Sequence, residues 1–350
     1  MVQSINDFRM RWRVPGIAIG VSCRGEQEFY CSGFSDIERS LPFSPRTVIP
    51  IGSVTKPFIA HAVSLMVSKG LLEWEVPITD YIKGLRFADQ EIQAKASLAD
   101  FLSMRTGLDG YKEWQTFEGG DSDELKAFIS RIPRTGVFRE SYIYSGLSFA
   151  IAAMVLHEVS DRSWTEILEA ELFRANDMQD HGFSWKEALE TQSTSKGYIC
   201  KESEWTELVL SPTEQHLVRP DCTLCMSTRD LLKWTGILRS NVAFKKMTTP
   251  HVLTHFPDIP LDFWPESYGL GWGCRTYRGH SMAYHRGSER GFRSLVAILP
   301  ESEIAIAILS NCDRNLLIHL LLNQFLDALL NHSYIPWEPV FEAYSKQIMG

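Results

Sequence analysis

The sequence lacks an apolar run long enough to cross a membrane. Its most apolar segment, Leu316 to Leu330, is interrupted by four polar side chains and falls short of the required run, which is about 20 residues. We expect a packed helix here, with Asp313 as its N-cap. The first 16 residues show neither a continuous apolar stretch after the first basic residues nor a small-residue cleavage site, so we expect no secretory signal peptide.

Cysteine and positive charge are also scarce. The seven cysteines are odd in number and scattered, which argues against a disulfide framework and favours a reducing compartment, the cytoplasm. The net charge of −8 lacks the basic footprint that nucleic-acid phosphates require. With 44% apolar and 22% charged residues, the chain has the composition of a globular protein. We expect neither a nucleic-acid nor a membrane partner.

Strand-like segments occur at both ends of the 350-residue chain. Gly16–Cys23 and Glu28–Ser32 flank a turn and predict a hairpin. Phe292–Leu299 and Ile304–Ser310 form a second pair around a Pro-containing turn. The middle of the chain has helical patterns, so we predict an α+β protein whose antiparallel sheet is built from both ends of the chain.

Two helices stand out in the middle. Pro57–Lys69 carries an apolar stripe and ends at Gly70, a residue typical of helix C-termini. Leu147–Val159 is almost wholly apolar and predicts a buried helix. Residues 110–125 are rich in glycine and aspartate, which predicts a mobile loop.

Ser53 and Lys56 stand at the start of the first of these helices. Residues three apart share one helix face, which would place the lysine amine beside the hydroxyl. Serine needs such a base to become a nucleophile, and burial with nearby positive charge can lower a lysine pKa enough to supply it. The helix N-terminus would favour a developing oxyanion. The Ser-x-x-Lys pattern also arises by chance: Ser193–Lys196 matches it, in a polar stretch that we interpret as surface.

The flanking residues extend this pattern into a family resemblance. Ile51–Lys56 resembles the nucleophile segment of class C β-lactamases and related esterases and D-peptidases. Further segments resemble that family in the same order, over about residues 10 to 330, and several weak motifs in order form a strong signal. They are Phe101–Leu108, Tyr144–Gly146 at the place of Tyr-x-Asn, Ser227–Leu231, Tyr268–Trp272 and His285–Gly287.

The resemblance implies a β-lactamase/transpeptidase-like fold, with an antiparallel sheet flanked by the terminal helices. Residues 1–60 and 220–335 would form the sheet subdomain of one catalytic domain. Residues 61–219 would form an inserted, mainly helical subdomain. The active site would lie in the cleft between them.

The resemblance also implies roles for three catalytic residues. Ser53 would accept the acyl group, and Lys56 would act as a base or proton shuttle. Tyr144 would exchange a proton with Ser53 or the leaving group, for which it needs the nearby charge of Lys56. Tyr142 is the rival for this role, and a packed tyrosine before a buried helix is the alternative.

A strand lining the cleft would complete the site. His285 would supply positive charge or a hydrogen bond near Tyr144 or the substrate, unless it is an ordinary surface histidine. Gly287 would let the strand lie against the substrate. The backbone N–H groups of Ser53 and Ser288 would form the oxyanion hole.

Two positions depart from the family pattern. Gly146 replaces the asparagine of the second motif, so the amide that would contact a substrate carbonyl or the lysine is missing. Arg286 is a bulky cation at a position that is often small in the family. Both weaken the case for β-lactam or peptide substrates and are compatible with an esterase or acyltransferase that builds a different pocket.

Other short patterns carry less information. Gly146–Ala150 mimics a nucleophile elbow, but its serine opens an apolar helix instead of following a strand. His251 and His255 lack the glutamate of a zinc-protease motif. Cys222 and Cys225 form an isolated pair. We therefore infer no metal and no organic cofactor.

The sequence thus predicts serine-dependent acyl transfer through a Ser53 acyl-enzyme. The substrate would be an ester, thioester or amide of a small molecule, including a secondary metabolite, or a thioester on an acyl carrier or synthase. Water, an alcohol or an amine would remove the acyl group. The alternative is a non-catalytic binding or scaffold protein that retains the fold.

Overall fold

The computed structural model describes residues 2–117, 121–201, 204–254, 265–313 and 316–349. Within these ranges, nine strands form one antiparallel sheet in the order β3-β2-β1-β14-β13-β12-β11-β10-β9. Ile17 of β1 pairs with Ser310 of β14, which confirms that both ends of the chain build one sheet. The strands are β1 (Gly16–Cys23), β2 (Glu26–Asp36), β3 (Leu41–Pro42), β9 (Val252–Leu253), β10 (Ser267–Tyr268), β11 (Gly273–Tyr277), β12 (His280–Glu289), β13 (Phe292–Leu299) and β14 (Ile304–Ser310).

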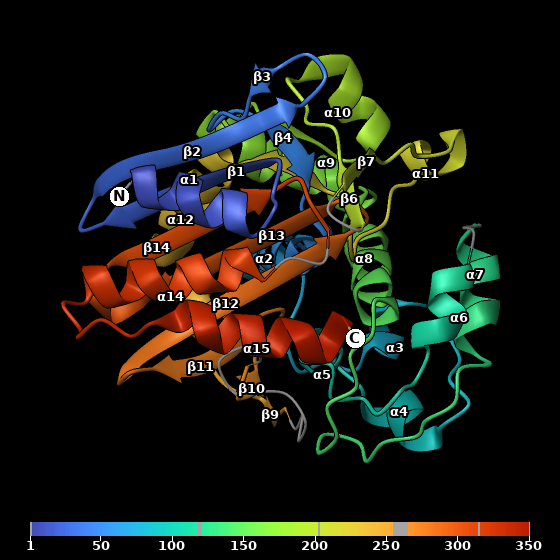
Figure 1. Ribbon diagram of the computed structural model, residues 1–350. Coiled ribbons are helices and arrows are strands. Elements are labelled where there is room, and N and C mark those ends of the chain that lie inside the picture. Colours follow the sequence, from blue (N-terminus) through green and yellow to red (C-terminus); the bar gives the residue numbers. More distant parts are fainter. Residues whose placement is uncertain (1, 118–120, 202–203, 255–264, 314–315, 350) are drawn as a thin grey trace.

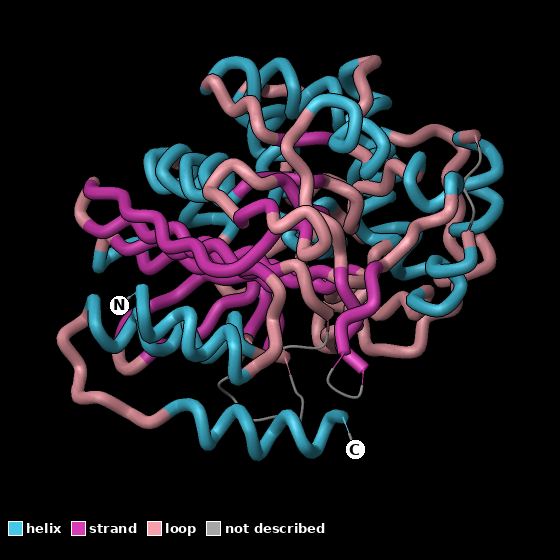
Figure 2. Tube along the Cα trace, turned by 45° about the horizontal axis from the view of Figure 1, so that its top comes forward, coloured by secondary structure: helices cyan, strands magenta, loops and turns pink. Residues whose placement is uncertain are grey.

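Helices cover both faces of this sheet (Figure 1). On one face lie α1 (Val2–Arg11), α14 (Leu317–Leu329) and α15 (Trp337–Met349); on the other lie α2 (Thr55–Ser68) and α12 (Thr228–Ser240). Because both faces are covered, all seven residues of β14 are buried and its sequence is an apolar run. In Figure 2 the terminal helices lie below the sheet and most other helices above it.

The helix predicted near the C-terminus is present, but its predicted cap is wrong. The helix α14 begins after Leu316, whose side chain makes no capping hydrogen bond, and Asp313 lies further upstream. Burial of the apolar face of α14 against the sheet therefore stabilises this helix without an N-cap. Within the described ranges, no helix has the length and apolar character needed to cross a membrane.

The stretch that follows α2, up to residue 224, is mainly helical and packs at one end of the sheet (Figure 1). Its helix α8 is buried along most of its length and packs against α2. The helices here are α3 (Ile78–Tyr81), α4 (Gln90–Lys95), α5 (Leu98–Leu102), α6 (Tyr111–Thr116), α7 (Ser122–Ile129), α8 (Leu147–Ser160), α9 (Trp164–Leu168), α10 (Trp185–Thr191) and α11 (Pro212–His216); α13 (Ala243–Met247) follows α12. Two small sheets contain β4 (Val48–Pro50), β8 (Cys225–Ser227) and β5 (His181–Gly182), and β6 (Tyr198–Lys201) and β7 (Glu204–Glu207).

The prediction of a loop over residues 110–125 is wrong for most of that range. It contains α6 and the start of α7. Asp121 caps α7 by accepting hydrogen bonds from the backbone N–H groups of Asp123 and Glu124. The aspartate that suggested a loop is therefore a helix-start signal.

A buried carboxylate ties α5 to the segment that carries Tyr144. Asp100, which is fully buried, accepts hydrogen bonds from Arg105 Nε (2.7 Å) and from Arg139 Nε and Nη2 (both 2.9 Å). The backbone N–H of Ile143 donates to the Met104 carbonyl at 3.0 Å. This network holds the chain just before Tyr144 against the helical part.

We expect Asp100→Asn to lower the free energy of unfolding by about 3 kcal/mol, because two arginines lose a buried counter-charge. Urea denaturation at pH 7 measures this loss. The control is Asp123→Asn, since the Asp123 side chain is 92% exposed and lies 3.6 Å from Lys126; its effect should stay below about 0.5 kcal/mol. Equal losses in the two variants would contradict a structural role for the buried network.

Candidate active site

Ser53 lies on a tight 3₁₀ turn, Gly52–Val54, that leads directly into α2. Gly52 has a φ of +52°, a conformation that favours glycine. The Thr55 hydroxyl donates to the Gly52 carbonyl at 2.7 Å and fixes the turn. Pro57 lies in the first turn of α2, where its missing N–H costs no helix hydrogen bond. The sequence around Ser53 therefore specifies a rigid helix start.

Lys56 brings the predicted catalytic residues together. Its side chain is buried, and Nζ donates to Ser53 Oγ at 3.1 Å and to the Asp221 carbonyl at 2.8 Å. The Tyr144 ring centroid lies 4.9 Å from Nζ. Ser53, Lys56 and Tyr144 thus meet at one point, from α2 and from the segment that precedes α8.

The charge on Lys56 differs from what burial alone predicts. Burial lowers the pKa of Lys56, but Coulombic interactions with Tyr144, Asp221 and Cys222 and a hydrogen bond with Tyr144 outweigh it and raise the pKa above 10.5. Lys56 is therefore an ammonium in the resting site.

Tyr142 packs against a different neighbour from Tyr144. Its ring packs against Tyr268 with 5.4 Å between centroids, and burial raises the pKa of Tyr142 well above 10. A phenol in that setting holds its proton. Of the two tyrosines, Tyr144 is the one that contacts Lys56.

The end of β12 runs along the Ser53 turn. β11 pairs with residues 280–284 of β12, and residues 285–289 continue past it. A Cβ at Gly287 would lie 1.9 Å from the Ile51 carbonyl oxygen and 2.2 Å from Ser294 Oγ. A Cβ at Gly52 would lie 3.0 Å from the Ser288 nitrogen. This close approach places the backbone of Ser288 beside that of Ser53, as an oxyanion hole would require.

His285 is buried and neutral. Its Nδ1–H donates to the Arg286 carbonyl at 2.8 Å, so its Nε2 accepts from the Tyr268 hydroxyl, also at 2.8 Å. Burial and the charge of Lys56 lower the pKa of His285 to about 3. This residue therefore orders the cleft strand by hydrogen bonds and adds no positive charge at neutral pH.

Arg286 lies on the opposite face of β12, because successive side chains of a strand alternate. Its charge adds to burial in lowering the pKa of His319, a residue of α14 on the far face of the sheet. The structure does not bring the Arg286 side chain to Ser53.

Gly146 lies against side chains that the sequence did not single out. A Cβ at Gly146 would lie 2.3 Å from Asp221 Oδ2 and 2.7 Å from Trp114 Nε1. Arg219 Nε donates to Asp221 Oδ1 at 3.1 Å, and the guanidinium lies 4.3 Å from the Trp114 ring centroid. The glycine in place of asparagine was the one sequence signal of this crowding.

Of the patterns set aside in the sequence, the cysteine pair borders this site, because Cys222 acts on the pKa of Lys56. Ser148 is buried inside α8. Lys196, of the second Ser-x-x-Lys copy, forms ion pairs with Asp36, Glu38 and Glu207. All seven cysteines are free thiols, and His255 lies outside the described residues.

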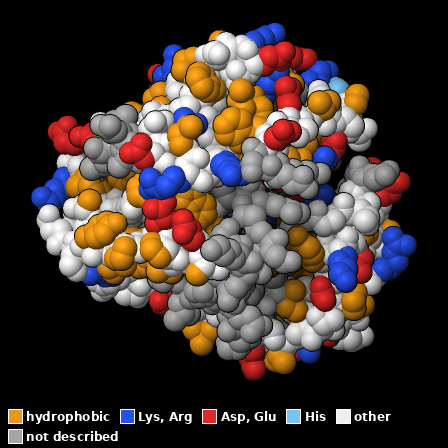
Figure 3. Space-filling model, viewed as in Figure 1, with side chains coloured by type: hydrophobic (Ala, Val, Ile, Leu, Met, Phe, Trp, Pro, Cys, Tyr) orange, Lys and Arg blue, Asp and Glu red, His pale blue; other side chains and the backbone are white. Residues whose placement is uncertain are grey.

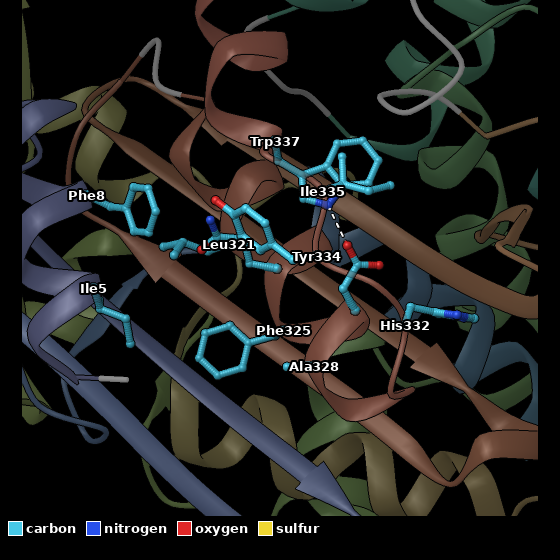
Figure 4. A pocket seen from close by; sticks show the side chains of 11 residues that line it. Ile5, Phe8, Leu321, Phe325, Ala328, His332, Tyr334, Ile335 and Trp337 are labelled. Carbon is cyan, nitrogen blue, oxygen red and sulfur yellow. Dashed lines mark hydrogen bonds between the residues drawn. The ribbon is translucent and has the colours of Figure 1, made fainter.

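A cavity of about 410 Å³ lies on the other face of the sheet (Figure 4). Phe8 reaches it from α1, and Phe325 from α14; Trp337 Nε1 donates to the Asp327 carboxylate at 2.8 Å. Figure 3 views this face of the molecule, where apolar side chains lie among charged ones. The sheet separates the cavity from Ser53, so the cavity is no part of the acyl site. Its lining residues are Ile5, Phe8, Leu321, Gln324, Phe325, Asp327, Ala328, His332, Tyr334, Ile335 and Trp337.

The antiparallel sheet covered on both faces, with Ser53 beside the buried Lys56 at the start of α2, is the architecture of a β-lactamase-like fold. A model of the Beta-lactamase family matches residues 4–327, and this chain belongs to that family.

Comparisons with individual proteins agree with this assignment. The chain is 23% identical to the unguisins hydrolase ungD′ of Aspergillus campestris (strain IBT 28561) over 326 residues, which cover 86% of this chain and 59% of that protein. It thus spans about three fifths of that relative. The octameric penicillin-binding protein homologue from Pyrococcus abyssi has a similar fold, with a TM-score of 0.81, 22% identity and coverage of 96% and 78% of the two chains. The D-amino acid amidase from Ochrobactrum anthropi SV3 has a TM-score of 0.76, 20% identity and coverage of 94% and 98%.

We expect Gly287→Ala to abolish turnover by separating β12 from the Ser53 turn, because the new methyl would overlap the Ile51 carbonyl. Overpacking of this kind also costs about 1–3 kcal/mol of stability. The matched control is Gly236→Ala in α12, where an added Cβ meets nothing within 4 Å and should stabilise the helix by up to about 1 kcal/mol. Ester hydrolysis and thermal unfolding measure both variants; an active Gly287→Ala enzyme would show that the strand need not touch the turn.

Because folded His285 stays neutral, the free energy of unfolding depends on pH. The unfolded state binds a proton near pH 6.5, whereas folded His285 binds one only near pH 3. The contribution of His285 to the free energy of unfolding is complete above pH 6.5 and declines as the pH falls, by about 2 kcal/mol between pH 7 and pH 5. We expect His285→Gln to flatten the pH dependence of the urea midpoint by that amount.

The control for this prediction is His157→Gln, because His157 is exposed on α8. It should leave the pH dependence of unfolding close to that of the wild type. The account of His285 would be wrong if His285→Gln kept the full wild-type slope.

Proposed function

We propose that this protein is a serine hydrolase that forms an acyl-enzyme at Ser53. The observation that carries the proposal is the 3.1 Å contact between Ser53 Oγ and the buried Lys56 amine, with Tyr144 packed against that amine. A serine hydroxyl in a fixed contact with a buried lysine, at a helix start, is arranged for nucleophilic attack.

The reaction has two steps. Ser53 Oγ attacks the substrate carbonyl carbon, and its proton passes to a neighbouring base. The N–H groups of Ser53 and Ser288 stabilise the oxyanion, and the leaving group departs with a proton. Water then attacks the acyl-enzyme and releases the acid; an alcohol or amine in its place would give acyl transfer.

The substrate that we propose is an ester or amide of a small molecule. Similarity to proteins named an unguisins hydrolase and a D-amino acid amidase supports a hydrolytic reaction. Gly146 stands where the related second motif has an asparagine that would contact a substrate amide, and Asp221 and Trp114 fill the space beside it. This supports a substrate whose acyl group differs from those of β-lactams and cell-wall peptides.

We expect Ser53→Ala to reduce hydrolysis of p-nitrophenyl butyrate to the buffer rate without a large change in the thermal midpoint. Lys56→Ala should lower kcat/KM by about 10²–10⁴-fold. The control is Ser193→Ala in the second Ser-x-x-Lys copy, which should retain wild-type rates. A folded wild type with no Ser53-dependent turnover of esters, thioesters or amides would favour a non-catalytic binding protein instead. Adding methanol separates the two fates of the acyl group, since a methyl ester product appears only if an alcohol can replace water.

A further inference from the structure

The cavity on the far face of the sheet has an apolar interior and an open side (Figure 4). Ile5, Leu321 and Phe325 line it and are at most 5% exposed. Ala328 and Tyr334 line it as well but are exposed, so they stand at the open side. The volume of about 410 Å³ lies in the lower part of the range for small-molecule pockets, about 300–1,000 Å³.

The fold holds this cavity open without a ligand. Its walls include α1 and α15, and Arg11 of α1 forms two hydrogen bonds, of 2.8 and 3.0 Å, with the carboxylate of Glu338 in α15. In the segment between α14 and α15, Arg278 Nη1 donates to the Ser333 carbonyl at 3.1 Å. Because these contacts fix the walls, a bound molecule does not have to order them first.

Aromatic side chains form much of the wall. Phe8 comes from α1, Phe325 from α14 and Trp337 from α15. An aromatic molecule in this space can make offset-stacked or edge-to-face contacts with these rings, which add to the gain from burying its apolar area. The lining therefore favours an aromatic ligand over an aliphatic one.

Asp327 brings a buried carboxylate to the wall of the cavity, because it lines the cavity and is 5% exposed. Its Oδ1 accepts hydrogen bonds from the Tyr277 hydroxyl at 2.8 Å and from Arg278 Nη1 at 2.7 Å. Among the described residues, its Oδ2 receives one hydrogen bond, from Trp337 Nε1 at 2.8 Å. A carboxylate oxygen can accept two hydrogen bonds, so Oδ2 has the capacity for one more donor.

The ion pair of Asp327 decides which ligands suit this wall. The charge of Asp327 is already paired with Arg278, so a cationic ligand would bury a charge in excess. An anionic amphiphile such as a fatty acid would bring a second carboxylate toward Asp327, and like charges repel. A neutral molecule with an N–H or O–H group avoids both costs and gains a hydrogen bond to a charged acceptor.

We propose that this cavity is a binding site for a neutral aromatic molecule of one or two rings that carries an N–H or O–H donor. The rings lie among Phe8, Phe325 and Trp337, and the donor binds Asp327 Oδ2. The sheet separates this site from Ser53, so the inference is independent of the reaction proposed there. The ligand bridges α1, α14 and α15, and because the cavity exists in the folded chain alone, binding stabilises the folded state.

The test uses indole and benzofuran as probes with the full chain. The two molecules have nearly the same shape, but benzofuran has an oxygen in place of the indole N–H. Isothermal titration calorimetry should find one indole site, with benzofuran bound about 10- to 100-fold more weakly, because a hydrogen bond to a charged group contributes that much. The thermal midpoint should rise with indole concentration.

Ala328→Phe places a bulky ring at the open side of the cavity and should abolish indole binding. Ala328 is exposed on α14, so the variant should keep its fold. Ala127→Phe is the matched control, because Ala127 is exposed on α7 and does not line the cavity. Asp327→Asn, as a second variant, should bring the affinities for indole and benzofuran close together. Thermal unfolding without ligand shows whether each variant is folded.

Indole binding that Ala328→Phe abolishes and Ala127→Phe preserves supports the proposal. Equal affinities of the wild type for indole and benzofuran overturn it, and so does indole binding that a folded Ala328→Phe retains. Tighter binding of laurate than of indole also overturns it, in favour of a site for an acyl chain. A folded wild type that shows neither heat of binding nor a rise in thermal midpoint up to the solubility limit of indole overturns it outright. All of these readouts measure binding, so failure of the reaction proposed at Ser53 would leave them unchanged.

Discussion

A buried ammonium group organises this molecule. Removing a charge from water costs several kcal/mol unless partners replace the lost hydration, and Lys56 is only 1% exposed. Its partners come from three segments of the chain: Ser53 on the turn before α2, the Asp221 carbonyl before β8, and the Tyr144 ring before α8. The sheet and the mainly helical stretch therefore meet at the place where the Lys56 ammonium needs its hydrogen-bond partners.

The chemistry of the site follows from the same constraint. The ammonium donates to Ser53 Oγ and so fixes the position of that hydroxyl. The neutral His285 fits this arrangement, since a second cation beside Lys56 would lower the pKa of the amine. The strand that carries His285 lies close to the Ser53 turn, and Gly287 makes this close approach possible.

Local patterns in the sequence were sufficient to predict much of this. The hairpin of β1 and β2, the strands β13 and β14 and the helices α2 and α8 follow from short-range periodicity and turn residues. The spacing of Ser53 and Lys56 placed both groups on one helix face. Local patterns could not show features that depend on residues distant in sequence. These are the contact of the Asp221 side chain with Gly146, the direction of the Lys56 pKa shift, and the face of β12 on which Arg286 lies. The two local errors, a cap at Asp313 and a loop over 110–125, arose because aspartate marks both loops and helix starts.

The measurement that tests the central claim most directly is covalent labelling with a fluorophosphonate probe, followed by intact mass and peptide mapping. The account predicts a single adduct on Ser53 that forms slowly or not at all in Lys56→Ala. An adduct on another serine, or none on a protein shown to be folded, would contradict the assignment of Ser53 as an activated nucleophile.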